Sequence, residues 1–129
     1  MVDKFQKILE SIRSEKGEVT FLGIFKMDEF TDKWSLLLSA EWITNEKRDD
    51  FFKYFTALIR KTLNEDEAKS IARVGLFPTD EHLIDLLLNY KTGTRIQEQT
   101  VNGNVIHDGY VLASNRNLEP HIVPLSVVG

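Results

Sequence analysis

The chain has 129 residues, a formal net charge of −4, 42% hydrophobic and 28% charged residues, and no cysteine. This balance is typical of one globular domain and excludes a disordered chain, while the absence of cysteine excludes disulfides and thiolate sites. The apolar runs are far shorter than the roughly 20 residues of a membrane span, and the N-terminal residues lack the apolar core of a signal peptide. We therefore expect one cytoplasmic domain over residues 1–129, with residues 115–129 as an irregular apolar tail.

The chain opens with a predicted helix over residues 2–16. Its apolar residues recur at helical spacing and form one stripe: Phe5, Ile8, Leu9 and Ile12. Gly17 stands where a left-handed cap would end the helix. Residues 19–26 follow as a strand with apolar residues on both faces, which indicates a place in the interior of a sheet.

The second predicted strand has the clearest alternation in the chain. One face carries Trp34, Leu36, Leu38, Ala40 and Trp42. This period of two indicates a strand with one fully apolar side. We expect it to form an antiparallel hairpin with the preceding strand, across a polar connection over residues 27–32.

A long helix is predicted over residues 46–63, capped by Thr44 or Asn45. We expect its buried face to comprise Phe51, Phe52, Phe55, Leu58, Ile59 and Leu63. The acidic run after it contains Asn64 and Glu67 at the spacing of a capping box. A solvated helix start explains this run better than a cation site, because consecutive helical residues point in different directions.

The C-terminal half predicts three strands and one short helix. Residues 71–77 form the first strand, and a helix over residues 81–90, capped by Thr79 or Asp80, is apolar nearly all round. Strands over residues 94–101 and 104–113 flank Asn102-Gly103, a strong hairpin signal because both positions tolerate positive φ. We therefore expect an α+β fold in the order α-β-β-α-β-α-β-β. A largely antiparallel sheet of about five strands would carry three main helices on one face or on both.

Motifs that identify a function are missing from the sequence. There is no glycine-rich phosphate loop, dinucleotide fingerprint, nucleophile elbow or pair of histidines at metal-ligating spacing. We expect no cofactor and no metal, and we lean away from an enzyme. The scattered cations and the net charge of −4 argue against a nucleic-acid partner.

The last predicted strand holds the best candidates for a ligand site. His107, Asp108 and Tyr110, with Trp42 from the second strand, could line a pocket. A structural role is the competing explanation, in which Asp108 lies exposed or pairs with Arg95 across the hairpin. Trp34 and Trp42 are either core residues at the two ends of the sheet or, where exposed, binding hot spots.

An excess of apolar residues supplies the candidates for an interface. They lie on the helix over residues 81–90 and in the tail: Leu83, Leu87, Ile122, Val123 and Leu125. The two segments either cover each other or present a patch to a partner.

Two hypotheses about function follow from these features. The first is a non-enzymatic protein-interaction or regulatory domain that self-associates or binds a protein partner. The second is a small-ligand-binding domain, or an enzyme whose site is assembled from scattered residues on the last strands. We favour the first, because a catalytic signature is lacking and apolar residues are in excess.

Overall fold

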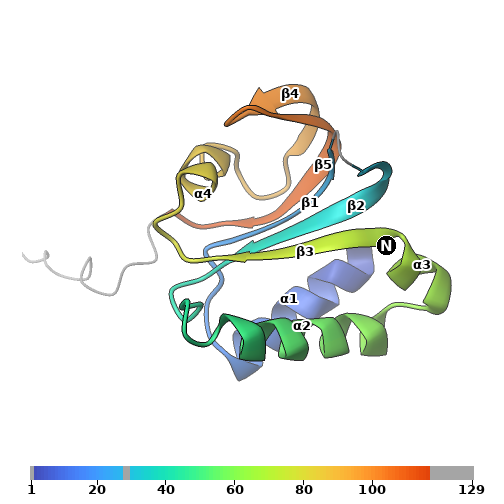
Figure 1. Ribbon diagram of the computed structural model, residues 1–129, viewed down its shortest axis with the longest axis vertical. Helices are drawn as coiled ribbons and strands as arrows, with labels where there is room; N and C mark the ends of the chain where they lie inside the picture. The colour runs from blue at the N-terminus through green and yellow to red at the C-terminus, as the bar shows by residue number, and fades with distance from the viewer. Residues whose placement is uncertain (1, 28–29, 117–129) are drawn as a thin grey trace, which may run out of the picture.

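A five-stranded sheet in the order β3-β2-β1-β5-β4 separates two helical layers in the computed structural model, which describes residues 2–27 and 30–116 (Figure 1). The elements are α1 (Val2–Glu15), β1 (Phe21–Met27), β2 (Phe30–Ser39), α2 (Arg48–Thr62), α3 (Glu65–Lys69), β3 (Ile71–Phe77), α4 (His82–Leu87), β4 (Arg95–Val101) and β5 (Asn104–Ser114). The α+β class and the predicted order of elements are confirmed, with α3 as a short additional helix. No described helix is long and apolar enough to cross a membrane.

The sheet is mixed, because one of its strand pairs is parallel. β1 pairs antiparallel with β2 and β5, and β4 pairs antiparallel with β5. β3 runs parallel to β2. A parallel neighbour requires a crossover connection, and α2 and α3 supply it between β2 and β3.

The first layer of the core lies between the sheet and helices α1 and α2 (Figure 1). The predicted stripe of α1 is fully buried there, together with the even-numbered leucines of β2 and the inner face of α2: Phe5, Ile8, Leu9, Ile12, Leu36, Leu38, Phe55 and Ile59. This arrangement agrees with the predicted periodicities of two and 3.6 residues.

The second layer lies on the opposite face of the sheet, where α4 packs (Figure 1). Its buried members come from α4 and all strands except β3: Phe21, Phe25, Met27, Leu37, Ile84, Leu87, Ile96, Val101, Ile106 and Val111. The helices are thus divided between the two faces, which was one of the two predicted arrangements.

Two predicted turns have the backbone that their glycines indicate. Asn102 and Gly103 both have positive φ, 51° and 77°, as a two-residue hairpin between β4 and β5 requires. Gly17 has a φ of 118° and ends α1, with its N–H bonded to Ile12.

Several predicted boundaries differ from the observed ones. β2 begins at Phe30, so the polar connection is shorter than predicted. The strand can include the charged Asp32 and Lys33, because both are exposed to water in this part of the hairpin. α4 ends at Leu87 rather than at residue 90. Asn89 and Tyr90 bond back three residues instead of four, which tightens the chain into a turn.

The predicted N-caps of α2 and α4 and one predicted core residue of α2 are wrong. Lys47 and Glu81 occupy the N-cap positions of α2 and α4, and neither makes a side-chain cap. Phe52 is 44% exposed, although we expected it on the buried face. Each helical residue is rotated by about 100° from the previous one, so Phe52 lies only about 20° around the helix from the buried Ile59. Its exposure therefore means that, among the described residues, no neighbouring element covers this part of α2.

Candidate interaction surface

The four residues predicted to bind a ligand do not form one site. Trp42 lies just after the end of β2. Trp34 lies at the other end of the sheet, where the pairing of β2 with β3 begins. The Nε1 of Trp42 donates a hydrogen bond of 3.0 Å to the carbonyl of Glu18, and its ring lies edge-on to Phe51 at 5.0 Å. These contacts join the segment after α1 to the start of α2, and the partly buried Trp42 packs against the first core layer.

His107 pairs with a carboxylate of the neighbouring strand. Its Nδ1 lies 3.0 Å from Oε1 of Glu98, and Glu98 has a positive φ of 50°. The imidazole is thus held against an exposed carboxylate on β4. The ligand-binding role of His107 remains a prediction.

Asp108 makes the ion pair that the structural explanation predicted. Arg95 donates two hydrogen bonds to it, of 3.1 and 3.2 Å, across the β4–β5 hairpin. The Gly109 N–H donates a third to Oδ1. The guanidinium hydrogen bond, as the largest cause, holds the pKa of Asp108 below its usual range, so the carboxylate stays ionised.

Tyr110 joins a row of aromatic and cationic side chains on four consecutive strands of the sheet, β2, β1, β5 and β4. Its ring lies 6.2 Å from that of Trp34. The Lys26 ammonium lies 4.8 Å from the Trp34 ring centroid, and the Arg95 guanidinium lies 5.4 Å from that of Tyr110. These four residues and Asp108 are referred to below as the Trp34–Tyr110 surface.

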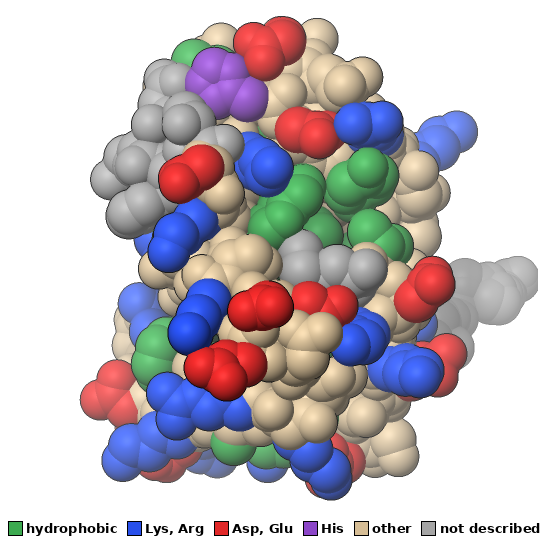
Figure 2. Space-filling model, turned by 90° about the vertical axis from the view of Figure 1, so that its right-hand side faces the viewer, with side chains coloured by type: hydrophobic (Ala, Val, Ile, Leu, Met, Phe, Trp, Pro, Cys, Tyr) green, Lys and Arg blue, Asp and Glu red, His purple; other side chains and the backbone are tan. Residues whose placement is uncertain are grey.

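Strand register explains why these side chains meet. Lys26 lies opposite Asp108, and Tyr110 lies opposite Arg95. Both rings pack on the margin of the first core layer and are only partly buried. Figure 2, which views the end where α1 and β3 begin, shows hydrophobic side chains gathered beside charged ones.

Lys26 and Arg95 were not among the predicted site residues. The sequence contained no indication of a role for Lys26, because a lysine at the end of an apolar strand is usually just solvated. Arg95 had entered only as a structural partner of Asp108. Trp34 was identified as a hot spot in the event of exposure, and its ring is partly buried against the first core layer.

A small, partly enclosed hollow lies elsewhere in the described part of the chain. It has a volume of about 130 Å³ and is lined by Thr20, Glu41, Thr79, Asp85, Leu88, Asn115 and Arg116. Ligand pockets usually measure about 300–1,000 Å³, so this hollow is too small for a metabolite. A larger hollow, of about 520 Å³ along α1, is open and lined by charged and polar side chains.

The predicted interface residues lie partly within the core. Leu87 is fully buried in the second core layer, and Leu83 is partly buried against it. Ile122, Val123 and Leu125 lie outside the described residues. The interface therefore remains a prediction.

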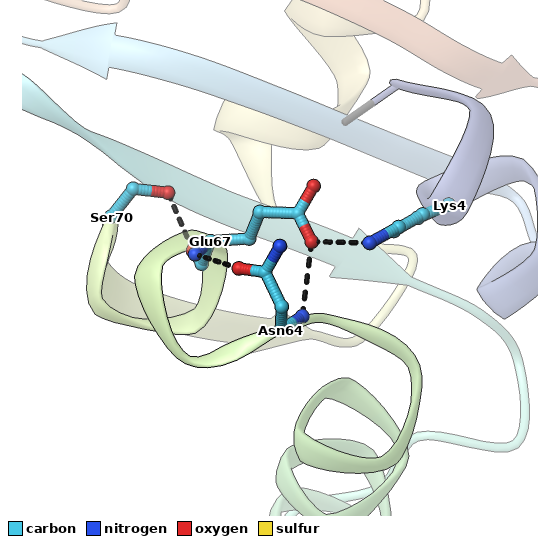
Figure 3. Close-up of polar contacts among 4 residues, drawn as sticks. All are labelled: Lys4, Asn64, Glu67 and Ser70. Atoms are coloured by element: carbon cyan, nitrogen blue, oxygen red, sulfur yellow. Dashed lines mark hydrogen bonds and ion pairs between the residues drawn. The ribbon is translucent and has the colours of Figure 1, made fainter.

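The acidic run before β3 caps a helix. Asn64 and Glu67 form the predicted capping box of α3, and Glu67 also accepts a hydrogen bond from Lys4 of α1 (Figure 3). The Lys4 bond, followed by that from the Asn64 N–H, lowers the pKa of Glu67. The described residues contain no group of three or more potential metal ligands.

Comparison of the chain with family models, with curated proteins and with solved structures gave no match.

Proposed function

We propose that this chain is a non-enzymatic protein-interaction domain and that the Trp34–Tyr110 surface binds its partner protein. The observation that carries the proposal is the pair of partly exposed aromatic rings with a cation over each. Tryptophan, tyrosine and arginine are the residues most enriched among binding hot spots. The surface contains all three.

The surface is also rigid, which lowers the entropic cost of binding. Strand pairing holds the backbone of all five residues, and the double hydrogen bond to Asp108 holds Arg95 in place over Tyr110. A preorganised side chain loses little freedom when a partner arrives. Lys26, which lies over Trp34, offers a positive charge to a carboxylate of the partner.

The shape of the surface favours a protein over a metabolite. The hollow at Asp85 and Arg116 and the one along α1 are lined by none of these five residues, and a small ligand usually buries most of its area in a cleft. A protein partner needs only a surface of complementary shape, and it can cover both rings together with the charged side chains around them.

The test is a pair of matched charge reversals on the same hairpin. A partner would first be captured from native extract on the immobilised chain, and its Kd would then be measured with purified components. We expect Lys26→Glu to raise this Kd about tenfold or more. The exposed Lys33 serves as the control, because Lys33→Glu makes the same charge change outside the surface.

Two results would count against the proposal. One is an equal Kd for wild type and Lys26→Glu, with both proteins folded by circular dichroism. The other is a metabolite that raises the melting temperature in a concentration-dependent way and loses this effect in Tyr110→Phe. That result would favour the small-ligand hypothesis.

A further inference from the structure

The two edges of the sheet differ in how well they are protected. β4 carries charged and polar side chains over most of its length, and its backbone is interrupted by the positive φ of Glu98. Such features prevent a second strand from pairing. β3, the other edge, has five apolar residues among seven, a single charged residue and no positive φ.

β3 is also accessible. Six of its seven residues are partly exposed, and in the described part of the chain β2 is its only neighbouring strand. Figure 1 shows β3 as the outer strand of the sheet, nearest the viewer. An apolar edge strand that lacks protection is a template for pairing with another chain.

Phe52 extends this apolar edge onto α2. Tyr54 faces α1, because its hydroxyl bonds to Glu15 and Lys16 lies over its ring. Phe52 is two residues away, about 160° around the helix, and therefore faces away from α1. Because α2 also contacts β3, this outer side of α2 borders the β3 edge. Among the described residues, Phe52 is the exposed large hydrophobic side chain.

We propose that a second copy of this chain pairs with the β3 edge, strand antiparallel to strand, about a twofold axis, and that it covers Phe52. This inference extends the proposed function to self-association, and it uses a surface separate from Lys26 and Tyr110. A second copy closes the assembly, because the pairing uses both β3 edges. The resulting sheet ends only in the two protected β4 strands, whereas an added peptide strand would present a new open edge.

Side-chain alternation restricts the register of this pairing. Residues directly opposite each other must point to the same face of the sheet. One residue of β3 must therefore lie opposite its own copy, with the twofold axis between the two. An axis at Arg73 would place two arginines together, and an axis at Leu76 would bring in Pro78, which has no N–H. An axis at Val74 would use Ala72, which lies at the irregularity of the β2–β3 register. Of the four central residues of β3, this leaves Gly75, which places Val74 opposite Leu76 of the second copy, two apolar side chains on one face.

The first experiment is sedimentation of the full chain over a concentration series. We expect a particle of twice the 14.9 kDa chain mass that dissociates on dilution. Phe52→Ser and Val74→Lys should each raise the dimer Kd about tenfold or more. Thr100→Lys, at an exposed position on the protected β4 edge, is the matched control and should leave it unchanged.

Hydrogen exchange provides a readout that does not depend on the variants. The β3 amides should become better protected as the protein concentration rises, while the β4 amides should not. A monomer at every concentration would overturn the inference, and so would an unchanged Kd in folded Phe52→Ser. The two proposals can be told apart, because Lys26→Glu should leave the mass unchanged and Phe52→Ser should leave capture of the other partner unchanged.

Discussion

Tyr54 shows how a partly buried polar side chain can connect two helices. Its hydroxyl donates a hydrogen bond of 2.7 Å to Oε1 of Glu15, and the Lys16 ammonium lies 4.7 Å from its ring centroid. Burial is the largest cause that raises the pKa of Tyr54, from its usual 10.0 to about 12, and Glu15 raises it further. The carboxylate accepts the phenolic proton in a hydrogen bond and would repel the phenolate.

This raised pKa predicts how stability depends on alkaline pH. Folding favours the neutral phenol, so the contribution of Tyr54 is fully present below pH 10.0 and is lost as the pH rises towards about 12. We expect Glu15→Gln to lower the pKa of Tyr54 but to leave it above 10.0, because burial remains. Ultraviolet titration of tyrosinate would measure this, with Tyr54→Phe to assign the signal. Glu10→Gln is the control on the same helix, and an equal effect of both variants would refute the role of Glu15.

At the scale of the strands, two glycines on adjacent strands make room for one aromatic ring. A Cβ at Gly109 would lie 2.2 Å from Cδ1 of Phe25, and a Cβ at Gly23 would lie 2.5 Å from its Cζ. Phe25 is fully buried, so its ring lies across the backbone of β1 and β5 and cannot move aside easily. These glycines therefore serve packing in the second core layer rather than a turn.

We predict that Gly109→Ala lowers the free energy of unfolding by about 1–3 kcal/mol, the usual cost of overpacking a core. The cost should be smaller in a Phe25→Leu background, because the shorter side chain leaves space for the new methyl group. Urea denaturation of the two single variants and the double variant would measure the coupling. Equal costs in both backgrounds would show that Phe25 is not the obstacle.

At the scale of the whole molecule, the sheet separates two core layers that do not share side chains. Ile59 belongs to the layer under α1 and α2, and Leu87 belongs to the layer under α4. Mutations that touch no common partner usually add in their effect on stability. The two faces should therefore respond independently.

We expect Leu87→Ala to cost about 2–5 kcal/mol and Ile59→Val about 0.5–1.5 kcal/mol. The double variant should equal the sum within about 0.5 kcal/mol. Ile84→Val with Leu87→Ala is the matched comparison, because both residues lie on α4 in one layer and should couple. Chemical denaturation would measure all of these values. A large coupling between Ile59 and Leu87 would mean that the layers are not independent. If Leu87→Ala lowered the free energy of unfolding only slightly, Leu87 would again be a candidate for the interface.

The amino-acid sequence by itself determined the order of the five strands and the three main helices, the buried faces of α1 and β2, and the turns at Gly17 and Asn102-Gly103. These features depend on local spacing and on backbone conformations that few residues adopt. It also indicated the pairing of Arg95 with Asp108, because a two-residue hairpin sets the register of its own strands.

Only the tertiary structure decided which elements meet across the sheet. β3 lies parallel to β2, and α4 lies on the face opposite α1. Lys26 and Trp34 came together with Tyr110 because β1 lies between β2 and β5, an order that local patterns do not encode. The exposure of Phe52 was equally hidden, because an apolar residue at the margin of a stripe is buried only where a neighbouring element reaches it. The candidate surfaces thus depend on contacts between residues distant in sequence, whereas the fold class could be predicted from local sequence patterns.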